Sequence, residues 1–429
     1  RDPEQPAAPV ADHWLVEFSM NRNLPIVAAS LFAWGLGEGL FFIFQPIYLE
    51  EWGADPVMIG SILGAAGIAI MIAQLPAGYL SDRFGPRPMM WASWILGTIA
   101  IFFMASANTL SMFVVGVITY GLSGFAIAPM NSYITRVRGR LSAGRALTLV
   151  SAAYNLGAVS GPLLGGWIAG RTGLRNVFWV SFGVVMVSTL LIFFIKPADV
   201  EPHEEIHARG NLFKNNRFLV LAGLAFLTVL IMYMPQPLTP NYLKNIHSLT
   251  VQQVGWLGSI ASVGNVIGFL LLGNLKPGIG FLVGQPLMIL FVLLIWQGTD
   301  FWMYGLGYFL LSGYRLTRTM LLATARSVIH PSDTGLAFGM METASGLAIV
   351  AAPTIAGFLY DRSPSLVYQV GLFALLAMVI IAGLLIPLHH RMEKFITNML
   401  VSKNNRVRLE AARRTIEELE GSRNDHAAS

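Results

Sequence analysis

Long stretches without a charged side chain constrain this chain more than any other feature of its sequence. A helix that crosses a bilayer needs about 20 predominantly apolar residues, because lipid offers no partner for backbone polar groups. Seven charge-free stretches are long enough for one such helix, and residues 88–135 are long enough for two, divided at the polar segment 105–109. The seven stretches are residues 56–81, 146–170, 176–195, 218–243, 245–275, 277–299 and 363–390.

Three further spans are interrupted by charge. Residues 23–49 contain Glu38, residues 301–325 contain Arg315 and Arg318, and residues 335–360 contain Glu342. The sequence therefore predicts an all-α membrane protein with twelve transmembrane helices. The composition agrees, since 55% of the residues are hydrophobic and only 12% are charged, whereas about a quarter of the residues of a soluble domain are charged.

Composition also excludes several classes of function. A mean hydropathy of +0.61 excludes a disordered chain and a nucleic-acid binder, and the absence of cysteine excludes a disulfide scaffold and a thiolate site. The chain has no Gly-x-x-x-x-Gly-Lys loop, so we do not expect ATP to drive it. Four polar residues of the segment 197–216 resemble metal ligands but are typical of a solvated linker: His203, Glu204, Glu205 and His207. We expect no metal, no cofactor and no enzymatic activity.

Positive charge is distributed unevenly between the two ends of the spans. Of the 28 Lys and Arg residues, 22 fall on the side that holds both termini and 4 fall on the other side. Because cytoplasmic loops carry the excess of Lys and Arg, we expect both termini in the cytoplasm. The sequence thus predicts a multi-pass protein of the plasma (cytoplasmic) membrane.

Short motifs recur at an offset near 190 residues. The matched pairs are Pro46 and Pro240, Leu63 and Leu257, Leu122 and Leu311, and Pro162 and Pro353, at offsets of 194, 194, 189 and 191. The recurrence predicts two six-helix bundles related by a pseudo-two-fold axis, at residues 1–196 and 217–390. A cytoplasmic linker (197–216) joins them, and an amphipathic tail (391–429) that we expect to contact membrane lipid follows. Parallel six-helix halves are typical of secondary transporters, with the substrate site between the halves near the midplane.

Two motifs resemble the signatures of the major facilitator superfamily. The segment Gly78-Tyr-Leu-Ser-Asp82-Arg83-Phe-Gly85-Pro-Arg87 resembles its cytoplasmic loop signature. The segment Gly157-Ala-Val-Ser-Gly161-Pro162-Leu-Leu-Gly165-Gly166 resembles its antiporter signature. The resemblance covers all twelve spans and is greatest to the drug–proton antiporter branch. It implies alternating access to a central cavity lined by spans 1, 4, 7 and 10.

The resemblance also implies roles for these residues. It assigns the first motif to a gate that locks the two halves on the cytoplasmic side, with Gly78, Asp82, Arg83, Gly85 and Arg87 as its residues. The alternative for Arg83 and Arg87 is that they are only cytoplasmic charges that set orientation. From spacing alone, Gly157, Gly161 and Gly165 share a helix face and allow close packing, Pro162 permits a kink, and Gly166 ends the motif.

Two positions depart from the family pattern. The matching loop of the second half, residues 273–278, has no acidic residue. Val117 occupies a position where the drug–proton branch often has an arginine linked to proton handling. Proton coupling by that usual route is therefore not expected.

Four ionisable residues lie inside the spans, where charge is costly and marks functional candidates. Counting 1.5 Å per residue places Glu38 near the midplane, and it places Arg318 and Glu342 about 10 Å deep on consecutive helices. Arg315 lies one turn deeper than Arg318. We expect Glu38 to exchange protons and Arg315 to bind an anionic substrate or to tune Glu38. The alternative for Arg318 and Glu342 is a static ion pair that joins their helices.

Polar and aromatic residues on the same helices complete the candidate site. Trp34, Glu38, Phe41 and Gln45 recur on one helix face, and the others are Asn131, Tyr154, Asn155, Tyr233 and Gln236. An aromatic cavity with few charges suits a lipophilic or amphipathic small molecule, although each of these residues is also compatible with helix packing.

The sequence therefore predicts a monomeric secondary transporter that exchanges protons for a lipophilic or amphipathic substrate. The alternatives are an importing symporter or uniporter for a polar or anionic solute, which Arg315 and Arg318 favour, and a lipid translocator on the same fold.

Overall fold

The structure is a computed structural model that describes residues 22–197, 215–325, 329 and 334–381. Every regular element in these described residues is helical, with no β-strand. The chain divides into two compact units after Leu375, and the candidate sites discussed below lie in the first unit. The predicted tail (391–429) and most of the predicted linker (197–216) lie outside the described residues.

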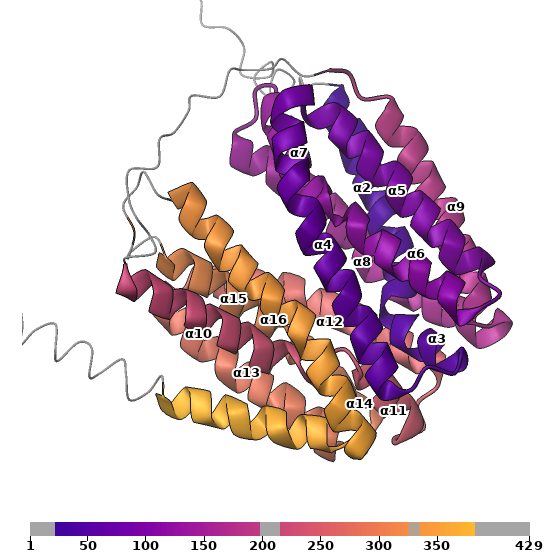
Figure 1. The fold of residues 1–429 in the computed structure, drawn as a ribbon, viewed down its shortest axis with the longest axis vertical. Coiled ribbons are helices and arrows are strands. Elements are labelled where there is room, and N and C mark those ends of the chain that lie inside the picture. The colour runs from indigo at the N-terminus through magenta and orange to yellow at the C-terminus, as the bar shows by residue number, and fades with distance from the viewer. Residues whose placement is uncertain (1–21, 198–214, 326–328, 330–333, 382–429) are drawn as a thin grey trace, which may run out of the picture. The chain divides into compact units, whose positions relative to one another are not determined.

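The first part of the chain forms the helices α2 to α9 (Figure 1). They are α2 (Asn23–Phe41), η1 (Phe42–Phe44), α3 (Gln45–Glu51), α4 (Pro56–Phe84), α5 (Pro86–Ser106), α6 (Leu110–Leu122), η2 (Ser123–Ala126), α7 (Ile127–Arg136), α8 (Ala143–Thr172) and α9 (Leu174–Phe193). The second part forms α10 (Asn216–Tyr233), α11 (Thr239–Asn245), α12 (Val251–Leu272), α13 (Pro277–Gln297), α14 (Phe301–Leu310), α15 (Ser312–Ala325) and α16 (Thr334–Arg362). A further apolar helix covers Leu366–Ile381.

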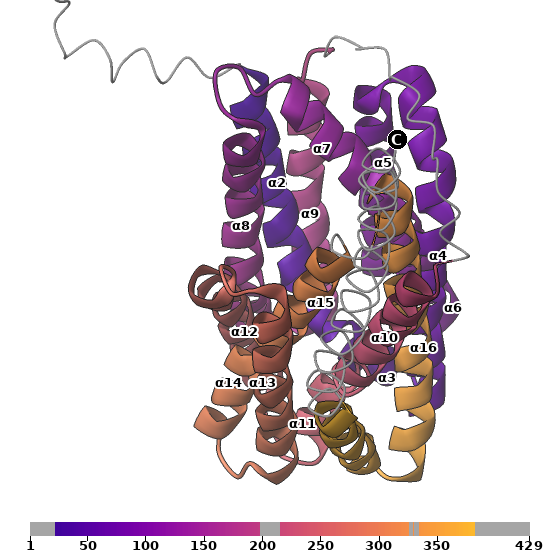
Figure 2. The ribbon, with the colours of Figure 1, turned by 90° about the vertical axis from the view of Figure 1, so that its left-hand side faces the viewer.

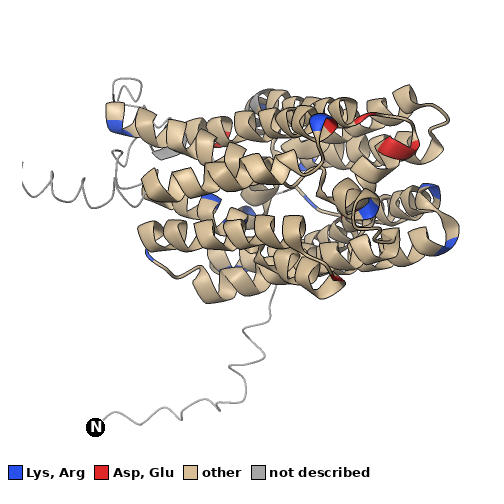
Figure 3. Cartoon of the chain, turned by 90° about the horizontal axis from the view of Figure 1, so that it is seen from below, with Lys and Arg blue, Asp and Glu red and all other residues tan. Residues whose placement is uncertain are grey.

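Ten helices among the described residues are long and apolar enough to cross a membrane. Each of them overlaps a span expected from the sequence. The other two expected spans differ: residues 301–325 are divided at Leu311 into α14 and α15, and the described part of residues 363–390 contains the helix Leu366–Ile381. Figure 3 shows that most of the helix length carries no charged residue.

Proline residues explain where the helices depart from the expected spans. Residues 218–243 were expected to form one helix, but α10 ends at Tyr233, just before Pro235 and Pro237, and α11 begins at Thr239. Proline has no backbone N–H and clashes with the preceding turn, so a helix ends or breaks at it.

A capping box explains a second departure. The helix expected over residues 245–275 begins only at Val251, because the side chains of Thr250 and Gln253 cap its first turn there.

Glycines bring α8 against α2. Gly157 packs on the carbonyl oxygen of Phe32, Gly161 on the backbone of Gly39, and Gly165 on the carbonyl oxygen of Leu40. The two helices approach closely because these positions carry no side chain, which is how small residues act at helix interfaces within membranes. The expected packing face of residues 157–165 thus lies against α2.

The two parts of the chain contact each other most extensively through two helix pairs, and α3 also meets α11. Gly60 and Gly64 of α4 pack on Pro353 and Val350 of α16, and Figures 1 and 2 show these helices side by side. In the second pair, Ser259 of α12 donates a hydrogen bond of 2.7 Å to a carbonyl oxygen of α8. Gly166 of α8 packs on Gly255 of α12 in the same pair.

Candidate functional site

Glu38 of α2 lies among hydrogen-bond donors from three helices. The Tyr154 hydroxyl of α8 donates to Glu38 Oε2 at 2.9 Å, and the polar groups of Tyr120 of α6 and Trp34 of α2 lie near the carboxylate. The seam between α2 and α8 sets this geometry, because Gly35 of α2 packs directly on the backbone of Tyr154. Hydrogen bonds to the charged form stabilise a carboxylate within a membrane segment.

Arg315 of α15 brings a positive charge to this carboxylate from the second part of the chain. Its guanidinium interacts electrostatically with Glu38 and Tyr154, and also with Tyr233 of α10. Arg315 is exposed, whereas Glu38, Tyr154 and Tyr233 are partly buried. Arg315 of α15 thus interacts electrostatically with one residue each of α2, α8 and α10.

Arg318 and Glu342 lie beside this group on α15 and α16. Arg318 Nη2 and Glu342 Oε2 are 2.5 Å apart, and 31% and 44% of the two side chains are exposed. A pair this exposed is screened by solvent and contributes little to stability. Its charges remain accessible, so the geometry is compatible with either a static pair or a solute contact.

Aromatic rings surround the charged groups. Trp34 stacks on Tyr120 with ring centroids 6.4 Å apart, and Phe41, which is fully buried, meets Tyr120 edge-on at 5.3 Å. In the second part, the rings of Tyr233 and Tyr314 are 5.7 Å apart. Phe41 is therefore a core residue that packs against Tyr120.

Several residues that the sequence predicts for the site make their contacts with groups other than Glu38. Gln45 is buried, with its amide nitrogen 3.9 Å from the Met104 sulfur. The amide of Gln236 donates to the Met232 carbonyl oxygen, and that of Asn155 to the Ser151 carbonyl oxygen. Asn131 is exposed on α7.

The expected gate motif forms the last turns of α4 and the start of α5 rather than an open loop. Gly85 alone links the two helices, at φ +83°, a conformation that favours glycine. The guanidinium of Arg87 lies 4.1 Å above the Trp91 ring, and that of Arg83 lies 5.4 Å from the Phe84 ring. Gly78 is within α4, and the side chain of Asp82 is outside the described set.

Sequence reasoning missed two features. Tyr120 joins Glu38, and the only available signal was a hydroxyl-bearing ring in an otherwise apolar run. Glu50, at the end of α3, accepts hydrogen bonds from Asn241 Nδ2 at 3.0 Å and Asn245 Nδ2 at 2.6 Å. The signal for this contact was the repeat itself, since α3 and α11 carry matching motifs.

No group of His, Asp or Glu among the described residues could hold a metal ion, and His203, Glu204, Glu205 and His207 lie outside them. An apolar recess of about 600 Å³ lies between α8, α12 and α14. Its walls include Leu163 and Leu164 of α8, Trp256 and Val263 of α12, and Trp302 of α14. This recess suits apolar chains rather than ions.

Comparison with known proteins gives consistent results. The sequence profile of the Major Facilitator Superfamily matches residues 27–275 and 221–400. The multidrug resistance protein MdtG of Salmonella paratyphi C (strain RKS4594) is 31% identical over 298 residues, which are 65% of this chain and 72% of that protein.

Solved structures with the same fold are more distant in sequence. The nucleoside transporter NupG is 14% identical with a TM-score of 0.70, over 85% of this chain and 98% of that one. The human organic anion transporter MFSD10 (TETRAN) is 17% identical with a TM-score of 0.60, over 84% of this chain and 99% of that one. At such low identity these likenesses concern the fold alone.

Proposed function

The chain belongs to the major facilitator superfamily, a family of transporters rather than enzymes, and on this premise we propose that it exports a lipophilic or amphipathic small molecule in exchange for protons. The family makes it an integral, multi-pass membrane protein. The relative named multidrug resistance protein supports efflux over uptake.

The proposal includes the architecture expected from the sequence. Twelve spans form two six-helix bundles, residues 1–196 and 217–390. The protein lies in the plasma membrane, and both of its termini are in the cytoplasm. The monomer alternates between a state open to the cytoplasm and a state open to the outside. The gate motif of residues 78–87 closes the cytoplasmic side in the second state.

The coupling mechanism rests on the position of Glu38 of the first half, which accepts a hydrogen bond from Tyr154 and lies within electrostatic range of Arg315 of the second half. When Glu38 is ionised, its carboxylate attracts Arg315 and accepts the Tyr154 hydrogen bond. Protonation removes the negative charge and weakens this link between the halves. A proton on Glu38 therefore changes the free-energy difference between the two states, which is what coupling requires.

The contacts between the halves support a state open to the cytoplasm. They involve the beginning of α4 with the end of α16, and the end of α8 with the beginning of α12. In the proposed topology these ends face the outside. This conformation is the one in which an exporter loads its substrate.

The aromatic lining supports the substrate class. Trp34, Tyr120, Tyr233 and Tyr314 place flat apolar faces beside the charged groups. Such surfaces bind flat or amphipathic molecules through area rather than through many directed hydrogen bonds. The positive charge of Arg315 then favours substrates that carry no net positive charge on the part that lies beside it.

The experiment measures substrate-driven proton movement in proteoliposomes that contain the Glu38→Gln variant. We expect the variant to bind substrate but to lose proton movement. Asp361→Asn, an exposed acid at the end of α16, is the matched control and should couple normally. Undiminished coupling in Glu38→Gln would refute the role of this carboxylate.

A second candidate is an importer of a polar or anionic solute, favoured by the exposed guanidinium of Arg315. Counterflow with a panel of labelled solutes distinguishes it, since an anion importer would exchange anions and lose that exchange in Arg315→Gln. A labelled phospholipid in the same panel tests the lipid translocator alternative, which the apolar recess favours.

A further inference from the structure

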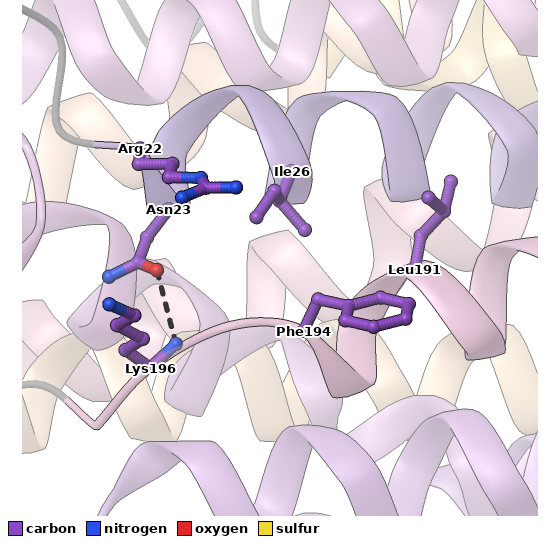
Figure 4. A pocket seen from close by; sticks show the side chains of 6 residues that line it. All are labelled: Arg22, Asn23, Ile26, Leu191, Phe194 and Lys196. Atoms are coloured by element: carbon purple, nitrogen blue, oxygen red, sulfur yellow. Dashed lines mark hydrogen bonds between the residues drawn. The ribbon is translucent and has the colours of Figure 1, made fainter.

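A second pocket lies far from Glu38, where α2 begins and α9 ends. It has a volume of about 390 Å³ and is lined by Arg22, Asn23, Ile26, Leu191, Phe194 and Lys196. Figure 4 shows the cationic side chains of Arg22 and Lys196 at one end of this pocket and the apolar side chains toward the other. The pocket thus has a charged end and an apolar end.

The segment that carries Lys196 is held in place by its backbone. Asn23 Oδ1 accepts a hydrogen bond from the Lys196 N–H at 3.1 Å, and the Tyr133 hydroxyl donates to the Lys196 carbonyl oxygen at 2.6 Å. The chain is therefore fixed after α9 ends at Phe193, and Lys196 stays beside the start of α2. The charged end of the pocket is built rather than accidental.

The electrostatics of this end favour an anion. Arg22 and Lys196 are both exposed, and neither takes part in an ion pair that joins described residues, where the pairs are Lys244–Glu50 and Arg318–Glu342. In addition, α2 begins at Asn23 without a side-chain cap. The positive end of the helix dipole adds to the two full charges.

The apolar end indicates which anion. Ile26 belongs to α2 and Leu191 to α9, both long enough to cross a membrane, and Phe194 follows α9 with 71% of its surface exposed. In the proposed topology these side chains lie at the depth of the acyl chains, just inside the charged end. A free phosphate ion would use the two cations and leave the apolar wall without a partner.

We propose that this pocket binds one anionic phospholipid, with the headgroup phosphate between Arg22 and Lys196 and an acyl chain along Ile26, Leu191 and Phe194. Basic pockets between transmembrane helices on the cytoplasmic side are suited to anionic headgroups. Bound lipid joins the first and last spans of the first half at their cytoplasmic ends, so its loss should loosen that end of the bundle.

The test is native mass spectrometry of the full-length protein in neutral detergent, titrated with phosphatidylglycerol or with phosphatidylcholine of the same chains. We expect phosphatidylglycerol to bind more tightly. Each removed charge should weaken its binding about five-fold, from roughly 1 kcal/mol per cation near the surface. Arg22→Ala with Lys196→Ala should therefore bind about 25-fold more weakly, and Arg22→Lys with Lys196→Arg should bind normally.

Three controls separate the outcomes. Lys276→Ala removes a cation at the start of α13, outside the pocket, and should bind like the unmodified protein. Melting without lipid shows whether each variant folds. Equal affinity of the double alanine variant, or equal affinity for the two lipids, overturns the proposal. Thermal protection by inorganic phosphate equal to that by phosphatidylglycerol overturns the choice of a lipid as occupant.

Discussion

Glu50 and Lys244 lie 194 residues apart, the offset that also separates Pro46 from Pro240, and their charged groups approach to 3.8 Å. The matching ends of the internal repeat therefore meet each other. Asn241 and Asn245 reinforce the contact with hydrogen bonds to the same carboxylate. In the proposed topology this cluster holds the outer ends of the halves together.

Replacing Glu50 should shift the protein toward the outward-open state. Glu50→Ala removes two amide hydrogen bonds to a carboxylate, worth about 1.5 kcal/mol each, and a partly exposed ion pair that adds little, so the closed outer side loses about 3 kcal/mol. We expect about a 100-fold increase in the ratio of outward-open to inward-open protein. Because the chain has no cysteine, spin labels at Met58→Cys and Ile246→Cys, both exposed, can report the distance directly.

The matched control for this measurement is Asp361→Asn, which removes an exposed acid outside the cluster. It should leave the distance distribution unchanged. If Glu50→Ala gives the same distribution as the control, the cluster does not hold the outer side closed.

Removing the Tyr154 hydroxyl should weaken coupling without unfolding the protein. Tyr154→Phe keeps the ring but deletes the donor to Glu38 Oε2, and a hydrogen bond to a charged group is worth about 1.5 kcal/mol. We expect about a ten-fold loss of substrate-driven proton movement in proteoliposomes. Thr172→Val, which removes an exposed hydroxyl that bonds only within α8, is the control, and equal rates in the two variants would contradict the role of Tyr154.

The sequence predicts the spans well because charge-free length is nearly sufficient to identify a membrane helix. It predicts side-chain direction less well where the helix changes pitch. Gln45 was expected on the face of Glu38, but the 3₁₀ turn Phe42–Phe44 lies between them. That turn advances about 120° per residue instead of 100°, so Gln45 meets Met104 of α5 instead.

Contacts between distant segments could be derived from spacing only in part. The depth count brings Arg318 and Glu342 to one level, and the structure places them 2.5 Å apart. The approach of Arg315 to Glu38 depends on how the two parts of the chain pack. No periodicity in the sequence encodes that packing, so the electrostatic partner of Glu38 could be identified only from the structure.

Adding a methyl group to the seam between α2 and α8 should destabilise the protein. At Gly161 a Cβ atom would overlap the backbone of Gly39, and such overpacking costs about 1–3 kcal/mol. We expect Gly161→Ala to lower the melting temperature. Gly183→Ala in α9, where a Cβ would meet nothing within 4 Å, should melt at or slightly above the native temperature, since alanine favours helix. Equal melting of both variants would contradict the packing role of Gly161.

Stability should fall in mild acid because of His247, which lies between α11 and α12. The Tyr304 hydroxyl donates to the Gly298 carbonyl oxygen at 2.6 Å. Nδ1 of His247 must therefore donate to the Tyr304 oxygen, 2.7 Å away. Its Nε2 is buried without a partner among the described residues. Protonation would place an unsatisfied N–H there, and burial accordingly lowers the pKa of His247 from its ordinary value of 6.5.

The sign of the pH effect follows from this lowered pKa. Between the folded and unfolded pKa values the unfolded chain binds more protons, so the stabilisation is complete above pH 6.5 and is lost as pH falls through the folded pKa. The slope contributed by one proton is at most about 1.4 kcal/mol per pH unit. Thermal melting from pH 8 to pH 5 should therefore show a smaller decrease for His247→Gln than for the native protein. Parallel curves would mean that this histidine does not titrate on unfolding, and the assigned hydrogen-bond directions at Tyr304 would then be wrong.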